Sequence, residues 1–422
     1  MTEIPKVMPL ADPSPAHQPD QVDGYARRAI LASASGYAMD GFDLLILSFG
    51  LLAISQSMGV SLSEAGSLTS LTLWGAVIGG VAFGYLADRF GRARMLAWSI
   101  ILFAAFTGLC ALAPNMETLS LFRFIAGAGL GGEFGIGMTL AAEAWPTAKR
   151  ARATALVGIG WQVGVLVAAL VSPWAIENLG WRGLFAIGAV PALLAFLMRK
   201  TMGEPELFKR SVADRAKTDK ARTTVPIRLL FADPTTAKAT IGILILCSVQ
   251  NFGYYGVMTW LPTYLSKSLG LGLTKSALWT AVTVLGMMAG IFVFGLLADR
   301  IGRRPIFWIY QAGAVVSLVV YSRLSDELTL LAGGAIMGFF VNGMLGGLGA
   351  LMAETYVTQV RSLAQNLLFN LGRGIGGLAP VVVALVAVQY GFPVAIGALA
   401  GLYVLEMIAM LLIPERKGAA LV

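Results

Sequence analysis

Six ionisable side chains stand within long apolar stretches of the sequence. They are Asp40, Asp43, Arg123, Glu133, Arg373 and Glu406. An ionised side chain at the centre of a membrane-spanning helix costs about 2.5–3.5 kcal/mol on insertion scales, so it usually faces the interior of a helix bundle or a water-filled cavity. We therefore expect the chemistry of this protein to reside in these residues and in the polar groups around them.

Asp40 and Asp43 are suited to carry a proton. They are three residues apart, so they share one face of a helix. Two carboxylates this close in a medium of low dielectric constant resist being charged at the same time. We assign proton coupling to Asp40, Asp43, Arg123 and Glu133, with Arg123 holding the deprotonated carboxylate. The alternative is a static ion pair between Arg123 and an aspartate, which would only hold the helix of Asp40 and Asp43 against the helix of Arg123.

Arg373 is suited to bind an anion. It lies in the middle of an apolar run, with Gln365, Asn366 and Asn370 in the preceding turns. A guanidinium group donates two parallel hydrogen bonds to a carboxylate, which favours Arg373 as the contact for a substrate carboxylate. The alternative is that Arg373 pairs with an acid of the protein, for which Glu406 is the candidate.

Amides and tyrosines recur at helical spacing in another apolar run. Gln250 and Tyr254 are four residues apart, as are Asn251 and Tyr255, so each amide shares a helix face with a tyrosine. Such side chains suit hydrogen bonding to a polar ligand, whereas the aromatic rings alone would also fit core packing or interfacial anchoring. The predicted substrate-binding residues are Arg373, Gln162, Gln250, Asn251, Tyr254, Tyr255, Asn366 and Asn370.

The elements that must position these residues form a repeat. Residues 84–94 (GYLADRFGRAR) recur as residues 295–305 (GLLADRIGRRP), at an offset of 211 residues, which is half of the 422-residue chain. Glu143 and Glu354 share this offset, as do Arg150 and Arg361. Several landmarks at one offset predict two duplicated halves.

The repeated charged loops predict a network that closes one end of the molecule in one conformation and breaks in another. Each aspartate is expected to cap a helix N-terminus or to bind arginine across the halves. A phosphate-binding loop is excluded, because the Gly-Lys-Ser/Thr signature is missing. The predicted members of this gate network are Asp88, Arg89, Arg92, Glu143, Arg150, Asp299, Arg300, Arg303, Glu354 and Arg361.

Composition places the chain in a membrane. It is 57% hydrophobic and 13% charged, whereas soluble domains carry about 25% charged residues. Apolar runs of 18 or more residues predict spanning segments, and these must be helices because lipid offers the backbone no hydrogen bonds. We expect an all-α membrane protein with spans at 29–53, 65–86, 95–113, 119–143, 153–175, 182–200, 239–266, 275–297, 304–321, 329–354, 362–389 and 392–413.

These twelve spans divide the chain into five parts. The predicted parts are a disordered tail (1–28), a six-helix half (29–200), a central loop (201–238), a second six-helix half (239–413) and a short tail (414–422). Most of the 31 Lys and Arg residues fall in the tails and in the loops on the same side, so the positive-inside rule predicts that both termini and the central loop are cytoplasmic. No signal peptide is expected.

The remaining composition argues against other classes of protein. The net charge of +8 comes mainly from short loops on one side, which does not favour a nucleic-acid partner. The only histidine, His17, lies in the N-terminal tail, so no metal site and no cofactor are expected. Cys110 and Cys247 lie in apolar runs and are expected to be buried free thiols, with a disulfide between them as the alternative.

These motifs resemble those of the major facilitator superfamily over residues 29–418. The repeated loop is similar to its signature loop, and residues 123–133 (RFIAGAGLGGE) resemble the fourth-span motif of proton-coupled members. Residues 203–206 (GEPE) and 414–418 (PERKG) are similar to motifs of the sugar-porter-like branch. Residues 40–43 (DGFD) most resemble aromatic acid:proton symporters, and sialate and monocarboxylate symporters are similar. The resemblance implies alternating access by rocking of two halves about a midplane site, with a monomer as the usual state.

The sequence thus predicts a symporter of the cell inner membrane that imports a proton and a small organic anion, with aromatic carboxylates among the candidates. The alternative is a proton-coupled transporter of a sugar or polyol, which Gln250 and Asn251 favour and Arg373 disfavours. A membrane sensor would need a larger signalling segment than the short central loop. An enzyme is not expected, because no nucleophile–base pair stands out.

Overall fold

The computed structural model describes residues 22–190, 203–217, 226–265, 270, 273–419 and 421. Within these residues the regular elements are all helices. The first half contains α1 (Gly24–Met58), α2 (Leu62–Phe90), α3 (Arg92–Cys110), α4 (Met116–Ala144), η1 (Thr147–Lys149) and α5 (Arg150–Ile187). Two short elements follow, α7 (Glu206–Lys217) and η3 (Pro226–Phe231). The second half contains α8 (Pro234–Thr263), α9 (Leu273–Ile301), α10 (Arg303–Tyr321), α11 (Glu327–Gly343), α12 (Leu345–Thr355), α13 (Arg361–Gly376), α14 (Ala379–Tyr390), α15 (Phe392–Ala398), α16 (Ala400–Ala409) and η5 (Met410–Leu412).

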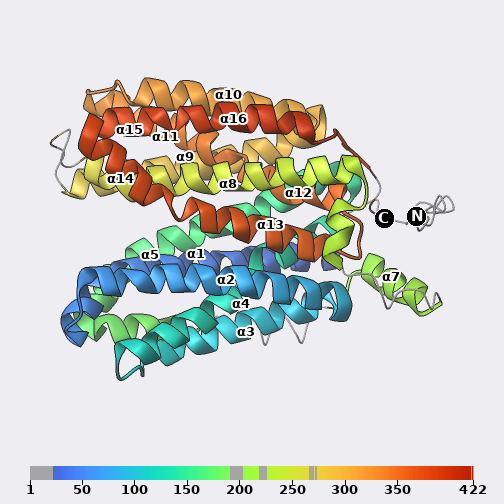
Figure 1. Ribbon diagram of the computed structural model, residues 1–422, viewed down its shortest axis with the longest axis horizontal. Coiled ribbons are helices and arrows are strands. Elements are labelled where there is room, and N and C mark those ends of the chain that lie inside the picture. Colours follow the sequence, from blue (N-terminus) through green and yellow to red (C-terminus); the bar gives the residue numbers. More distant parts are fainter. Residues whose placement is uncertain are drawn as a thin grey trace, which may run out of the picture.

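The two halves repeat one another in their helix bounds. α9 begins and ends 211 residues after α2, and α10 stands in the same relation to α3. The pair α11 and α12 together spans the residues that lie 211 positions after α4. Figure 1 shows the two halves side by side, one blue to green and the other yellow to red. The predicted all-helical fold of two pseudo-symmetric halves is confirmed.

Eleven helical stretches among the described residues are long and apolar enough to cross a membrane, when α11 with α12, α13 with α14, and α15 with α16 are each counted as one stretch. The predicted span at 182–200 is described only at its start, where α5 continues past Gly180, a glycine with φ 67° that breaks the helical path. Residues 191–202 lie outside the described part of the chain. In the second half, the last three predicted spans are each divided into two helices, α11/α12, α13/α14 and α15/α16.

Local sequence signals set the helix ends. Ser61 and Glu64 form a reciprocal capping box at the start of α2, with Glu64 N donating to Ser61 Oγ at 3.1 Å and Ser61 N donating to Glu64 Oε2 at 2.8 Å. The turns from α2 to α3 and from α9 to α10 both pass through glycine at positive φ, 117° at Gly91 and 106° at Gly302. Glycine is the residue that adopts this conformation without strain.

Polarity is reversed relative to a soluble protein. Large apolar side chains point outward from the helices, with Val388 90% and Leu170 80% exposed. By contrast, Asp40, Arg123 and Glu406 are fully buried. This arrangement suits helices whose outer faces contact lipid, where burying apolar side chains within the bundle brings no gain over lipid contact.

Several predicted boundaries shift. α1 begins at Gly24 with Asp23 as its N-cap, so the helix starts inside the predicted N-terminal tail, while residues 1–21 lie outside the described part. The predicted central loop contains α7, which begins at Glu206. Figure 1 shows α7 and the last described residues at one end of the molecule, which we term the gate end. Cys110 and Cys247 are buried free thiols, and the disulfide alternative is wrong.

Candidate substrate site and gate

A pocket lies between the two halves, near the middle of the bundle. In this conformation its cavity volume is about 20 Å³, which is room for about one water molecule. Residues of α1, α5, α8, α11, α12 and α13 line it: Tyr37, Trp161, Gln250, Asn251, Tyr254, Tyr255, Asn342, Leu345, Phe369 and Arg373. The lining therefore combines aromatic rings, three amides and one guanidinium group.

Arg373 forms a two-pronged ion pair with Asp40 across the halves. Its Nη1 lies 3.0 Å from Asp40 Oδ2, and its Nη2 lies 2.9 Å from Asp40 Oδ1. The Nε of Arg373 donates to the hydroxyl of Tyr255 at 3.2 Å, and its guanidinium carbon lies 4.9 Å from the ring centroid of Trp161. The partner is thus an acid of the protein in this conformation. Glu406 is buried on α16, and its carboxylate oxygens have no hydrogen-bond partner among the described residues, so the predicted Arg373–Glu406 alternative is wrong.

Arg123 forms a second such pair, with Asp43, inside the first half. Its Nη2 lies 2.7 Å from Asp43 Oδ2, and its Nη1 lies 3.1 Å from Asp43 Oδ1. Thr107 Oγ1 donates to Asp43 Oδ1 at 2.6 Å, and Arg123 Nε donates to Thr72 Oγ1 at 3.2 Å. One face of α1 therefore carries two buried carboxylates, one held within its own half and the other held by the opposite half.

Glu133 is buried beside α1 without a cation. Ser99 Oγ donates to its Oε1, and no ion pair joins it to another described residue. Its other oxygen, Oε2, faces Gly36, where an added Cβ would lie only 2.4 Å away. Gly36 is one helical turn before Asp40, so Glu133 adjoins the same stretch of α1 as the two paired acids.

Three of the predicted substrate residues lie outside the pocket. Asn366 Oδ1 accepts from Gly135 N at 2.7 Å, and Asn370 Nδ2 donates to Gly131 O at 2.9 Å, so both amides bind the backbone of α4. Gln162 is buried, with its Nε2 3.7 Å from Met287 Sδ. These amides are not among the residues that line the pocket: Asn366 and Asn370 face α4, whereas Gln162 lies beside Tyr254 of the pocket wall. A part for them in substrate binding stays a prediction.

The remaining predicted residues do line the pocket, and several also bond within it. Gln250 Nε2 donates to Val341 O at 2.9 Å and to Asn342 Oδ1 at 3.1 Å. Asn251 Nδ2 donates to Cys247 O at 2.8 Å. Trp161 Nε1 donates to the hydroxyl of Tyr254 at 3.0 Å, which links α5 to α8 across the halves. The side-chain carbonyl oxygen of Gln250 has no hydrogen-bond partner among the described residues.

Sequence reasoning missed some lining residues. Tyr37 lies three residues before Asp40, and Phe369 lies four residues before Arg373, so both share a helix face with a predicted site residue. Asn342 is an amide within an apolar run of α11. These spacings and the isolated amide are the signals that could have identified them.

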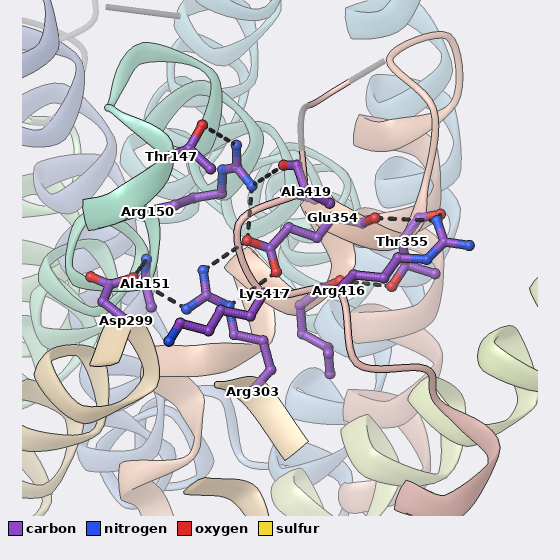
Figure 2. A network of polar contacts seen from close by, with 12 residues as sticks. Thr147, Arg150, Ala151, Asp299, Arg303, Glu354, Thr355, Arg416, Lys417 and Ala419 are labelled. Carbon is purple, nitrogen blue, oxygen red and sulfur yellow. Dashed lines mark hydrogen bonds and ion pairs between the residues drawn. The ribbon is translucent and has the colours of Figure 1, made fainter. Parts of the chain in front are cut away.

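The gate network of the second half centres on Glu354. Figure 2 shows its carboxylate between Arg150 of α5 and Arg303 of α10. Arg150 Nη1 lies 2.8 Å and Arg303 Nη2 lies 2.7 Å from Glu354 Oε1. Asp299 accepts from Ala151 N at 3.0 Å, so it caps the N-terminus of α5, a helix of the opposite half.

Residues after Pro414 cover this network. Arg150 Nη1 also donates to Ala419 O at 3.1 Å, and Arg416 Nη1 donates to Thr355 O at 3.3 Å (Figure 2). Glu415 Oε2 accepts from Arg304 N at 2.7 Å. The segment predicted as a short tail is therefore tied to the gate.

The first half has the matching arrangement. Asp88 Oδ2 accepts from Leu363 N at 2.9 Å, which caps α13 of the opposite half. Arg92 lies 3.3 Å from Glu143 Oε1, and Arg361 Nη1 lies 2.6 Å from the same oxygen. The structure brings together the predicted gate residues except Arg89 and Arg300, whose side chains are exposed and form no ion pair with a described residue.

Comparison with known proteins agrees with this architecture. A model of the Major Facilitator Superfamily matches residues 33–290. The chain belongs to the major facilitator superfamily. A second family model, described as sugar (and other) transporter, matches residues 198–422 of the chain.

Relatives of this major facilitator are transport proteins. It is 55% identical to a Haemophilus influenzae protein named "Putative metabolite transport protein", over 95% of this chain and 99% of the relative. It is 32% identical to the cis,cis-muconate transport protein of Acinetobacter baylyi, over 92% and 94%. Among solved structures, the proton:xylose symporter XylE is similar in fold, with a TM-score of 0.78 at 18% identity, covering 95% of this chain and 98% of that chain.

Proposed function

We propose that this major facilitator imports a small organic anion together with a proton. The observation that carries the proposal is the Asp40–Arg373 pair on the wall of the central pocket. A carboxylate of the protein occupies the place on Arg373 that a substrate carboxylate would take. Substrate and Asp40 then compete for one guanidinium group.

This competition gives a mechanism for coupling. When a substrate carboxylate displaces Asp40, the freed acid is left buried and without a cation, and it neutralises by taking a proton. Binding of the anion and binding of the proton thus favour one another. After release of both, Asp40 pairs again with Arg373 and draws α1 of the first half toward α13 of the second.

Asp43 and Glu133 complete the proposed proton path. Arg123 holds Asp43 in its ionised form, while Glu133 lies beside Gly36 and pairs with no cation of the described residues. A proton that reaches either acid is within reach of the stretch of α1 that carries Asp40. The static-pair alternative, in which Arg123 only locks α1 to α4, predicts no effect on coupling when Asp43 is neutralised.

The gate is proposed to be closed on the cytoplasmic side. The hydrogen bonds that join the two halves among the described residues run from the pocket to the gate end. Most Lys and Arg residues lie in loops at that end, which favours a cytoplasmic location for it and for both termini, in an inner membrane. Alternating access would require both gate networks to break.

The substrate class rests on the aromatic lining and on the relatives. Five aromatic residues line the pocket together with Arg373, which favours an unsaturated or aromatic carboxylate: Tyr37, Trp161, Tyr254, Tyr255 and Phe369. One relative is named for cis,cis-muconate. The second candidate is a sugar or polyol, favoured by the three pocket amides and by the sugar-transporter model that matches the second half.

Thermal stabilisation of the purified protein tests the proposal. Benzoate, cis,cis-muconate, lactate and hexoses are added in turn to the wild type and to Arg373→Ala. A ligand that binds only the folded state raises the melting temperature by mass action. A carboxylate that stabilises the wild type but not the variant supports the proposal. A hexose that stabilises both equally overturns it in favour of the second candidate.

A further inference from the structure

A second cavity opens between the halves at the gate end, away from the substrate pocket. Its cavity volume is about 260 Å³. The lining comes from the end of α4, from η1 and α5 of the first half, and from α9 of the second half. It consists of Val22, Trp145, Lys149, Arg152, Ala155, Leu156, Phe292 and Leu296.

Among the described residues that line this cavity, two are cations and none is an acid. Lys149 is exposed and forms no ion pair with a described residue. Arg152 reaches Asp299 with its Nε at 3.4 Å, but its side chain remains 33% exposed. Asp299 already accepts from Ala151 N and from Arg303 Nη1, so it does not depend on Arg152 for a partner. The cavity therefore has positive charge available for an anion.

The internal repeat shows that the fold does not require these cations. The positions 211 residues after Lys149 and Arg152 are Val360 and Leu363, which are 1% and 2% exposed. The equivalent interface of the other half is thus apolar and closed at these positions. Asp88, the counterpart of Asp299, caps α13 and pairs with Arg92 at 3.2 Å, as Asp299 pairs with Arg303, so neither aspartate needs a cation at the Arg152 position. The two cations are therefore present at the interface of α5 with α9 but not at the equivalent interface of α13 with α2.

Apart from the two cations, the wall of the cavity is mainly apolar. Phe292 and Leu296 are four residues apart on α9, and Leu156 faces them from α5. The side chain of Phe292 is 48% exposed although it lies within a helix long and apolar enough to span a membrane. Trp145 lies at the rim, where its indole donates to Ala26 O at 3.0 Å. A tryptophan beside lysine and arginine at the end of spanning helices is typical of the headgroup level of a bilayer.

We propose that this cavity binds an anionic phospholipid of the leaflet at the gate end. The phosphate of the headgroup lies against Lys149 and Arg152, and the upper part of an acyl chain lies along Leu156, Phe292 and Leu296. Basic cavities between spanning helices recognise lipid headgroups in this way. Because the walls belong to opposite halves, the bound lipid holds α5 against α9 and stabilises the closed gate.

The test measures melting temperature in detergent with added phosphatidylglycerol, with phosphatidylcholine at equal concentration, and with inorganic phosphate. The wild type is expected to gain stability from phosphatidylglycerol beyond the effect of phosphatidylcholine, and none from phosphate alone. Lys149→Gln is expected to weaken the apparent lipid affinity roughly five-fold, since one cation near a lipid surface contributes about that much. Lys149→Arg retains the effect, and the double variant K149Q/R152Q loses it.

Arg94→Gln is the matched control. Arg94 is an exposed cation at the start of α3 and does not line the cavity. If Arg94→Gln lowers the lipid affinity as much as Lys149→Gln does, the effect is general surface attraction and the proposal fails. It also fails if K149Q/R152Q responds to phosphatidylglycerol like the wild type, or if phosphate alone stabilises equally. Stabilisation by a substrate carboxylate should persist in Lys149→Gln, which separates this result from the proposed function.

Discussion

Replacing Asp40 with asparagine separates substrate binding from proton coupling. Asn keeps the size of the side chain but removes the charge that Arg373 contacts at 2.9 and 3.0 Å. A guanidinium group does not lose its proton in a protein. The Asp40→Asn variant therefore contains a buried cation without an anionic partner, beside the hydroxyl of Tyr255 and the ring of Trp161.

The expected magnitude follows from that unpaired charge. Removing one partner of a buried ion pair costs about 3–5 kcal/mol. Water entering the pocket recovers part of this cost, and a bound carboxylate recovers more of it. We expect the carboxylate affinity of Asp40→Asn to exceed that of the wild type by about 1–3 kcal/mol, which is about 5–150-fold. The ligand-free variant should melt at a lower temperature than the wild type.

Isothermal calorimetry with benzoate and cis,cis-muconate measures the affinities for four proteins: the wild type, Asp40→Asn, Arg373→Ala and the double variant. Arg373→Ala should not bind carboxylates, yet should remain folded because the unpaired Asp40 can take a proton. In proteoliposomes, Asp40→Asn should exchange substrate but fail to accumulate it under a proton gradient. If Asp40→Asn loses carboxylate binding as fully as Arg373→Ala does, the pair only holds the halves together and the competition mechanism is refuted.

Three further predictions concern the second acid and the gate. Asp43→Asn should abolish accumulation and alkalinisation of the medium while leaving carboxylate-induced stabilisation intact, and accumulation at the wild-type level would exclude Asp43 from coupling. Glu354→Gln removes the acid shared by two buried arginines and should destabilise the closed gate by about 3–5 kcal/mol. In a protein that also carries Thr154→Cys as a reporter, a maleimide added at the gate end should then label the cysteine. The control substitution Glu206→Gln, at an exposed residue, should leave the labelling unchanged. Gly135→Ala places a Cβ so close to Asn366 Oδ1 that the contact between the two halves must shift, so this variant should also favour the open gate. Unchanged labelling of the Thr154→Cys reporter would contradict this prediction.

The sequence was sufficient to predict the helices and their duplication. The offset found in the charged loops recurs in the bounds of α2 and α9, because homologous segments fold into equivalent helices. The contact between Asp43 and Arg123 was also accessible, since both lie in spans of one half. In each case the relevant information is local or repeated.

It was harder to predict which neighbour each side of a helix contacts. On α13, Phe369 and Arg373 face the pocket, whereas Asn366 and Asn370 face α4. These two pairs form adjacent stripes, and the direction in which a stripe faces depends on the rotation of the helix within the bundle. Polarity alone does not distinguish a ligand-binding amide from one that bonds a neighbouring backbone.

The Asp40–Arg373 contact depends on conformation as well as on fold. It joins residues on opposite halves, and alternating access requires such contacts to form in one state and break in another. The sequence identified both residues but assigned Arg373 to substrate. In the proposed mechanism both assignments hold at different stages of transport.

The two acids on α1 also meet their partners at very different times during biosynthesis. Arg123 follows Asp43 by 80 residues, whereas Arg373 follows Asp40 by 333 residues. At about 5–20 residues per second of synthesis, Asp40 waits on the order of half a minute for its cation. During that interval the first half lies in the bilayer with a bare carboxyl group, which is best accommodated in its protonated form. Completion of the second half then converts a neutral acid into an ion pair, so the assembly of the two halves is itself accompanied by release of a proton.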